Sequence, residues 1–509
     1  MPQLPAPSAY TPDPQILALG DAFYDPVDAS DFPQTILRFR NDRWAPSVGL
    51  GDLADEDWIA HFGRFRPLPG NLERPLALRY HGHQFRVYNP DIGDGRGFLF
   101  AQLRDGHARL LDLGTKGSGR TPWSRRGDGR LTLKGGMREI LATEMLEALG
   151  AETSKTFSLV ETGEALDRGD EPSPTRSAVL VRLQHSHIRI GTFQRLAYSE
   201  ETENIAKLVA YCLEHYYPHT RHCEERSDEA IQRTSDEKEE AGLLRSTRND
   251  EGAGSGGGRG DDAVLLLRNV VREGARLAAD YIAAGFVHGV LNSDNIAITC
   301  ESFDYGPWRF TPFWDGHFTA AYFDHAGLYS FGRQPEAIHW DILQLARSLT
   351  LVADLEALRA ELERFPELFQ QALVKAVFAR LGIVPTGEAR DAELLTAMET
   401  AMVTQTVKID RFFFDWRGGR RRGPSPADAA YGEEAFAEFV RRIAEYEAAP
   451  GALDHAYWSA PEPQSMHIEE VEAIWSRIDE ADDWSALHAK VAAVRRMGEA
   501  HRGSVSPAA

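Results

Sequence analysis

Short hydrophobic stretches separated by glycine and polar residues mark the first part of the chain. Residues 97–103 and 109–113 are apolar runs joined by a polar turn, and residues 177–183 form a third run. Runs of this length, bounded by turn residues, predict buried strands. Residues 136–150 differ, because their apolar positions recur at helical spacing up to Gly150, a residue that often ends a helix.

From about residue 196 the apolar spacing becomes helical. We expect helices over residues 203–216, 263–285, 335–355, 355–365, 366–381, 391–404, 468–478 and 484–497. A charged and then glycine-rich stretch interrupts this pattern at 219–262, and its composition predicts a disordered surface insertion without a catalytic role.

The order of these elements predicts an α+β protein. We divide it into four parts. Residues 1–75 are an irregular N-terminal extension that packs on the core, and 76–195 are a β-rich lobe. Residues 196–440, with the insertion, are a helical lobe, and 441–509 are a helical C-terminal extension.

Charge and composition exclude several classes of protein. The 509 residues carry a formal net charge of −21, which argues against a nucleic-acid partner. No apolar run approaches the roughly 18–20 residues of a membrane span, and the first residues lack the pattern of a secretion signal. Three cysteines without a C-x-x-C pair predict neither a disulfide framework nor a zinc site. We therefore expect a cytoplasmic monomer that binds neither nucleic acid nor membrane.

Residues 288–295 carry the clearest chemistry. Aligned with the H-R-D-…-N loop of protein kinases, Asn295 falls on the metal-binding asparagine, and Asp304 falls on the aspartate of D-F-G. Amide and carboxylate oxygens suit Mg²⁺. The loop therefore predicts a bilobal, kinase-like fold that binds ATP with Mg²⁺, or with Mn²⁺ in its place. The alternative is an ordinary turn in which both residues are structural.

One position departs from the kinase pattern. Val290 stands where a kinase carries its catalytic aspartate, and valine cannot accept a proton. Asp294 is the nearest carboxylate. Either Asp294 is the base, or the protein is catalytically silent.

The β-rich lobe supplies further kinase-like residues. Lys116 matches the strand lysine of kinases and Glu139 its partner on the following helix. The glycine segment 93–97 could turn backbone N–H groups toward phosphates. Arg182 and Arg189 are suited to phosphate as bidentate donors. Each feature alone is more often a surface pair or a hairpin, but their order along the chain favours a nucleotide site.

Taken together, these motifs resemble the selenoprotein O family. They are residues 79–85, 93–97, 116–119, 126–130, 138–139, 182–191, 288–295 and 304–307, in this order. The resemblance implies a kinase-like fold that binds ATP inverted relative to kinases and transfers AMP to Ser, Thr or Tyr hydroxyls of proteins. A kinase-like phosphotransferase and a catalytically silent, ATP-binding pseudokinase scaffold are the alternatives.

The resemblance also implies individual roles. Asp294 would be the proton acceptor, Asn295 and Asp304 the metal ligands, and Glu139 the partner of the lysine. The implied ATP ligands are Gly93, Gly95, Arg96, Lys116, Asp128, Gly129, Arg182, Arg189 and Asp304. Members of the family usually carry a selenocysteine or cysteine near the C-terminus. Residues 498–509 hold none, so a redox switch through a C-terminal thiol is not expected.

Overall fold

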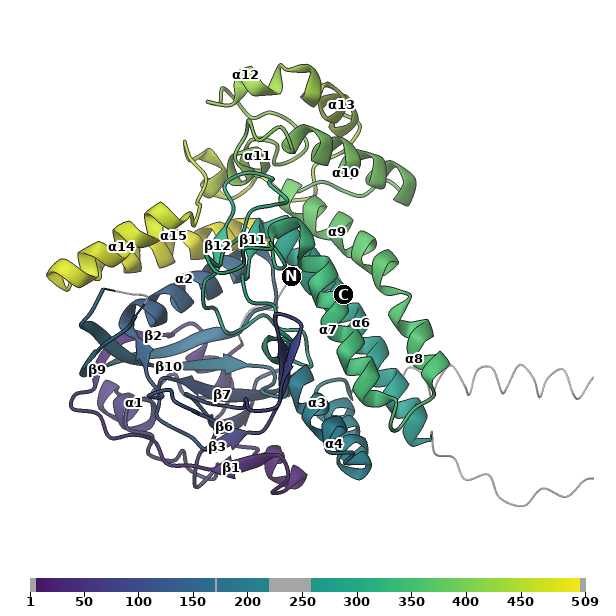
Figure 1. Cartoon of the computed structure of the whole chain (residues 1–509). Coiled ribbons are helices and arrows are strands. Elements are labelled where there is room, and N and C mark those ends of the chain that lie inside the picture. The colour runs from purple at the N-terminus through teal and green to yellow at the C-terminus, as the bar shows by residue number, and fades with distance from the viewer. Residues whose placement is uncertain (1–5, 170–171, 219–257, 504–509) are drawn as a thin grey trace, which may run out of the picture.

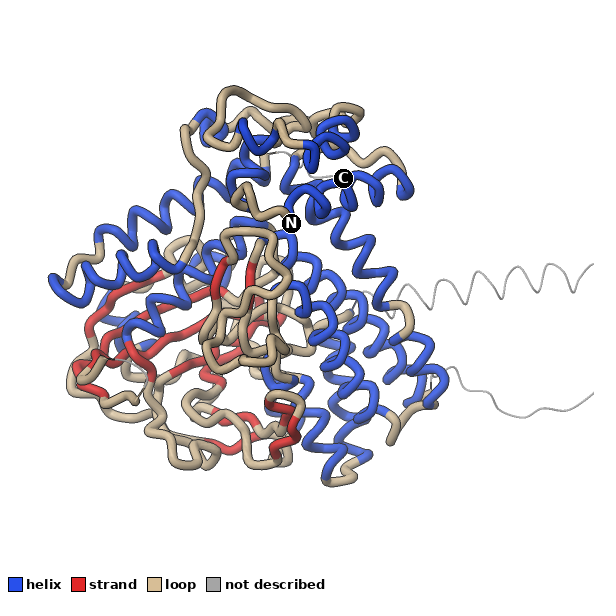
Figure 2. Tube along the Cα trace, turned by 45° about the horizontal axis from the view of Figure 1, so that its top comes forward, coloured by secondary structure: helices blue, strands red, loops and turns tan. Residues whose placement is uncertain are grey.

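The computed structural model describes residues 6–169, 172–218 and 258–503. It confirms the α+β class. The strands gather on one side of the molecule and most of the helices on the other (Figure 2). The largest hydrophobic core is continuous between the two parts, since Met137 and Leu180 belong to the same buried cluster as Val270 and Ile338.

The main sheet is antiparallel throughout, with the strand order β1-β3-β6-β7-β10-β9-β2 and with β8 paired to β10. Its strands are β1 (Tyr24–Pro26), β2 (Ile36–Arg40), β3 (Leu76–Leu78), β6 (Leu99–Arg104), β7 (Leu110–Lys116), β8 (Leu131–Thr132), β9 (Lys155–Leu166) and β10 (Thr175–Gln184). The three strands predicted from apolar runs correspond to β6, β7 and β10. β7 is buried along its whole length, which explains its continuous apolar character.

The first 75 residues are built into the sheet, whereas the sequence predicted an irregular extension. They supply the two edge strands β1 and β2 and the helix α1 (Asp55–Phe62). Trp58 of α1 is fully buried and its ring stacks on Phe157 of β9, with 4.9 Å between the ring centroids. Strands of three and five residues are too short to show a period in the sequence.

In the helical part, the helices predicted between residues 203 and 404 are present, but four others, at 190–198, 409–415, 428–431 and 434–443, were not predicted. Its helices are α3 (Ile190–Tyr198), α4 (Thr202–His215), α6 (Arg259–Ala284), α7 (Gln334–Leu349), α8 (Leu355–Leu362), α9 (Phe365–Leu381), α10 (Glu388–Met402), α11 (Ile409–Asp415), α12 (Asp428–Tyr431) and α13 (Glu434–Ile443). Residues 219–257 of the predicted insertion lie outside the described residues. Residues 259–262 are helical and begin α6, which corrects the predicted end of the insertion at 262. Within the described ranges, no helix is both long and apolar enough to span a membrane.

The two C-terminal helices lie along α2 (Leu133–Leu149), the helix that carries Glu139 (Figure 1). They are α14 (Ile468–Ala481) and α15 (Ser485–Arg502). Gly498 allows close packing here, because a Cβ at this position would lie 3.0 Å from the Cα of Ala148. Arg495 Nε donates to Glu144 Oε2 at 2.8 Å.

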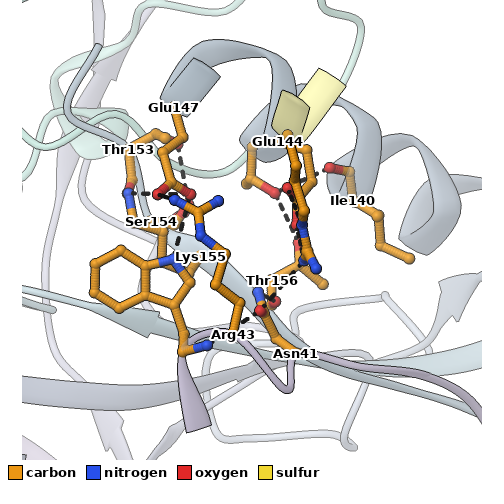
Figure 3. A network of polar contacts seen from close by, with 12 residues as sticks. Asn41, Arg43, Ile140, Glu144, Glu147, Thr153, Ser154, Lys155 and Thr156 are labelled. Atoms are coloured by element: carbon orange, nitrogen blue, oxygen red, sulfur yellow. Dashed lines mark hydrogen bonds and ion pairs between the residues drawn. The ribbon is translucent and has the colours of Figure 1, made fainter. Parts of the chain in front are cut away.

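The N-terminal segment holds the same helix through a polar network (Figure 3). Arg43 Nη2 lies 2.5 Å from Glu147 Oε1, and the indole N–H of Trp44 donates to Glu147 Oε2 at 3.3 Å. Asn41 Nδ2 donates to the carbonyl of Thr156 in β9 at 2.8 Å. Segments from both ends of the chain therefore fix α2 against the sheet.

Candidate active site

A cavity of about 390 Å³ lies where the sheet meets the segment 294–304 of the helical part. Every ATP ligand predicted from the sequence lines this cavity, and so does Asp294. Glu139 and Asn295 are not among the lining residues. The lining consists of Tyr80, Gln84, Ile92, Gly93, Asp94, Gly95, Arg96, Gly97, Thr115, Lys116, Trp123, Ser124, Arg125, Gly127, Asp128, Gly129, Arg130, Arg168, Arg182, Arg189, Asp294 and Asp304.

Lys116 is the centre of a buried ion-pair cluster at the end of β7. Its Nζ pairs with Glu139 Oε1 on α2 and lies 2.7 Å from Asp304 Oδ1. The predicted Lys–Glu pair is thus present, and Asp304 joins it. Burial alone would raise the pKa of Asp304, but Lys116 and the nearby arginines, above all Arg182, hold that pKa well below its usual range. Asp304 is therefore a carboxylate, as a metal ligand must be.

Arg182 has two donor atoms that face no acceptor within the described ranges. The side chain projects from β10, is 4% exposed, and its Nη2 lies 3.6 Å from Asp304 Oδ1. Its Nε and Nη1 have no hydrogen-bond partner among the described residues. Leaving such donors unpaired in a buried site is costly. Their presence beside a cavity indicates a site for an anionic ligand.

Arg189, just before α3, is bound to the protein on both sides. Its Nη1 donates to the backbone oxygen of Asp294 at 2.9 Å, and its Nη2 donates to Asp94 Oδ1 at 3.1 Å. Its guanidinium lies 4.4 Å from the ring centroid of Tyr80. Arg189 therefore positions the loop of Asp294 as well as adding positive charge to the cavity.

Asp94 lines the cavity but was not predicted as a site residue from the sequence. It lies inside the predicted glycine segment, is 6% exposed, and accepts the N–H of Leu78 at 3.0 Å as well as the bond from Arg189. The glycines on either side of Asp94 are required because other residues pack closely against their backbone. A Cβ at Gly97 would lie 2.0 Å from the oxygen of Thr115, and one at Gly93 would lie 2.6 Å from Trp123.

The segment 121–130 forms another wall of the cavity. Gly129 has φ of 73°, and a Cβ there would lie 2.3 Å from the backbone of Gly119, so only glycine fits without strain. Asp128 is half-exposed and its carboxylate pairs with Arg168 at 2.7 Å. Arg168 was not predicted, because it comes from the loop after β9, a strand that the apolar pattern did not reveal.

Asp294 has the environment of a general base. It lies in the short helix η3 (Ser293–Asn295) and packs on β4 (Gly82–Gln84), where a Cβ at Gly82 would lie 2.8 Å from Asp294 Oδ1. This Oδ1 has no hydrogen-bond partner among the described residues. Burial raises the pKa of Asp294 to about 7, and the charge of Asp304 adds to this, whereas Arg189 opposes it. A base with a pKa near the working pH is suited to proton transfer.

The chemistry of two residues fits a divalent cation. Asn295 Nδ2 donates to the carbonyl of Val290 at 3.0 Å, which leaves its amide oxygen as an acceptor. Asp304 adds a carboxylate. Mg²⁺ takes few protein ligands and completes its shell with phosphate and water oxygens. The described residues hold no cluster of three or more His, Cys, Asp or Glu side chains that would form a metal site by itself.

Comparison with known proteins gives a consistent result along the whole chain. The family model described as "Protein adenylyltransferase SelO" matches residues 8–495. A protein nucleotidyltransferase YdiU of Synechocystis sp. is 46% identical over 389 residues, which cover 75% of this chain and 73% of that protein. The YdiU of Gloeobacter violaceus is 39% identical over 499 residues, or 95% of each chain, and that of Vibrio cholerae is 30% identical over 395 residues.

The family match includes the cavity residues, the segment 288–304 and the C-terminal helices up to residue 495. They confirm the family inferred from the eight motifs. The chain belongs to the protein adenylyltransferase SelO family.

Proposed function

We propose that this protein transfers AMP from ATP to Ser, Thr or Tyr hydroxyls of other proteins, with ATP bound inverted relative to protein kinases. The observation that carries the proposal is the buried Arg182, whose Nη2 lies near Asp304 and whose Nε and Nη1 have no hydrogen-bond partner in the described part of the chain. A triphosphate supplies the acceptors that these donors lack. The family of the chain supports AMP as the transferred group.

The charge of the cavity agrees with a bound triphosphate. Its lining contains four carboxylates, on Asp94, Asp128, Asp294 and Asp304. The cationic side chains in the cavity lining outnumber these carboxylates. They are Arg96, Lys116, Arg125, Arg130, Arg168, Arg182 and Arg189. In the inverted orientation the β- and γ-phosphates leave together as pyrophosphate. Arg182 and Arg189 would then bind these outer phosphates and stabilise the leaving group.

The reaction requires one proton acceptor. The hydroxyl oxygen of the substrate attacks the α-phosphorus, the bond to the oxygen bridging to the β-phosphate breaks, and Asp294 takes the hydroxyl proton. Arg189 holds the backbone of Asp294 and so fixes the base. Mg²⁺ or Mn²⁺, held by Asn295 and Asp304, would neutralise phosphate charge when bound.

The arrangement of the two parts supports a kinase-like fold. A strand lysine, a helix glutamate and a loop aspartate meet in one cluster, as the chemistry of phosphoryl-binding kinases requires. We propose that the sheet with α2 corresponds to the N-terminal lobe and that α6 to α9 belong to the C-terminal lobe. The first 75 residues and the helices α14 and α15 then support the N-terminal lobe.

A paired labelling experiment tests the transferred group. The protein is incubated with Mg²⁺, a hydroxyl-bearing protein substrate, and ATP labelled in either the α- or the γ-phosphate. Label from the α-phosphate alone is expected on the substrate, and Asp304→Ala should abolish it. Label from the γ-phosphate alone would identify a kinase instead. Binding of ATP without any transfer would identify a scaffold.

A further inference from the structure

An exposed apolar surface adjoins the cavity on the side of Asp294. We propose that this surface, which we call the aromatic patch (Phe85, Tyr322 and Phe323), binds the protein substrate next to its acceptor hydroxyl. The occupant is a polypeptide segment that carries a large apolar side chain beside the modified Ser, Thr or Tyr. The inference rests on the proposed function and adds the substrate preference of the same site.

Two rings of the patch are exposed to water, since Tyr322 is 78% exposed and Phe323 is 42% exposed. Phe85 is partly buried and packs against the hydrophobic core. The ring centroid of Phe323 lies 5.8 Å from that of Phe85 and 5.1 Å from that of Tyr322. Single exposed apolar residues are ordinary, but aromatic rings that contact one another on a surface indicate a binding site.

The patch is continuous with the catalytic loop. Phe85 follows β4, whose Gln84 lines the cavity and whose Gly82 contacts Asp294. The backbone N–H of Phe85 donates to Asn292 Oδ1 at 3.0 Å, and the hydroxyl of Tyr329 donates to the same oxygen at 2.8 Å. The hairpin of Phe85 and the long loop of Tyr322 and Phe323 thus both attach two residues before Asp294. A substrate that brings its hydroxyl to Asp294 meets this patch.

The hairpin is held in a strained form. Phe85 and Arg86, the two residues between β4 and β5 (Val87–Asn89), have φ of 49° and 63°. Turns of this kind favour Asn-Gly, and non-glycine residues persist in this region of φ mainly at binding sites. Phe85 is held by the ring of Tyr329, with 5.0 Å between centroids, and Arg86 by an ion pair of 2.7 Å with Glu336. A patch fixed before binding loses less conformational freedom when the substrate arrives.

Three charged groups near Phe85 are paired with one another. Arg86 and Arg333 both pair with Glu336, at 2.7 Å and 3.2 Å. Because these side chains partly neutralise one another, they give little electrostatic preference for an acidic or a basic peptide segment. The surface therefore selects by apolar contact, which is why we assign an apolar neighbour of the acceptor rather than a charged one.

Two matched peptides test the preference. Each has one serine, flanked on both sides by phenylalanine in the first peptide and by asparagine in the second. The parent protein should transfer AMP to the first with a higher kcat/KM. A Tyr322→Ser/Phe323→Ser double variant should lose about tenfold in kcat/KM for the first peptide, through KM, and nothing for the second. Its KM for ATP should not change.

Leu351→Ser is the matched control. Leu351 is 41% exposed but follows α7, whereas the long loop precedes α7, and sixteen helical residues separate the two by about 24 Å. This variant should behave like the parent with both peptides. Equal kcat/KM of the parent for the two peptides, or an equal loss for both in the double variant, would overturn the proposal.

A binding measurement separates this inference from the proposed function. Fluorescence anisotropy follows labelled peptides in which alanine replaces the serine, in the presence of Mg²⁺ and ATP. Tighter binding of the phenylalanine peptide to the parent protein, with loss of this preference in the double variant, supports the patch. If no AMP is transferred in the same samples, that lack of transfer counts against the proposed function and not against the patch. Equal binding of both peptides together with AMP transfer would refute the patch alone.

Discussion

Lys116 Nζ lies 2.7 Å from Asp304 Oδ1 while it also pairs with Glu139, so one amine joins β7, α2 and the loop of Asp304. Lys116 and Glu139 are buried and Asp304 is nearly so, and the charge of Lys116 helps to hold the pKa of Asp304 well below its usual range. The cluster therefore ties the geometry of the cavity to the position of α2.

Lys116→Met should remove most activity. The change leaves Glu139 without its cation and removes the ion pair with Asp304. The cavity wall around Lys116 therefore loses a positive charge, and Asp304 is no longer fixed in position. We expect kcat/KM for ATP to fall by about 10²-fold or more. Steady-state kinetics measure this. Lys134→Met is the control, because Lys134 pairs at 2.7 Å with Glu472 of α14 and does not line the cavity. Near-parental activity of Lys116→Met would contradict the role of the cluster.

Asp294 should set the pH dependence of transfer. Because its pKa is raised to about 7, the base is protonated and inactive at pH 6 and is charged at pH 8. The profile of kcat/KM against pH should rise through about 7. Asp294→Asn should abolish transfer while Mg-ATP binding remains, as calorimetry would measure. Full activity of this variant would exclude Asp294 as the base.

The Asp294 carboxyl group should make the protein less stable as the pH rises, whereas it makes the protein more active. A carboxyl whose pKa is about 7 in the folded protein, against 3.8 as its ordinary value, keeps its proton where the unfolded chain has lost it. The free energy of unfolding therefore falls as the pH rises from about 4 to about 7. Asp294→Asn removes this cost and should stabilise the protein by about 1–4 kcal/mol at pH 8. Urea unfolding at pH 5 and pH 8 measures the difference, which should be present mainly at pH 8.

Arg182 and Arg189 should respond differently to substitution. Arg182 has two donor atoms without a partner among the residues that the structure describes, so Arg182→Met should raise the KM for ATP by about tenfold or more with little loss of stability. Arg189 donates to Asp94 and to the loop of Asp294, so Arg189→Met should lower both stability and kcat. Thermal unfolding and kinetics on the two variants check this contrast. An equal loss of stability in both would show that Arg182 is structural.

Arg495 lies outside the cavity and should stabilise the folded protein through its ion pair with α2. It pairs with Glu144, which is 5% exposed, on the helix that also carries Glu139. Arg495→Met leaves that carboxylate buried without its cation, so the protein should lose about 1–3 kcal/mol of stability. Its neighbour Arg496 is exposed, and Arg496→Met is the matched control with no expected effect. Denaturant unfolding of both variants measures the difference.

Much of this site could be predicted from the sequence, since its residues lie in short local motifs. Lys116, Glu139, Arg182 and Asp304 each fall in a segment with a clear strand, helix or loop pattern, and the structure brings them together. Asp94 could have been predicted as well, because it lies inside the glycine segment 93–97.

Other features depend on contacts that no local pattern records. β9 mixes polar with apolar residues although its first eight positions are buried, so its sequence gives no clear alternation. The pairing of Arg495 with Glu144 joins residues 351 positions apart. The strain in the hairpin of Phe85 depends on Tyr329 and Glu336, which the sequence places more than 200 residues away. Only the folded chain shows these relationships.

The mass of a peptide acceptor after reaction distinguishes AMP transfer from phosphate transfer. A serine-containing peptide is incubated with the protein, Mg²⁺ and ATP, and its intact mass and the released product are measured together. If the protein transfers AMP, the peptide gains one AMP group, pyrophosphate is released in equal amount, and Asp294→Asn shows neither. A gain of one phosphate with release of ADP would contradict AMP transfer.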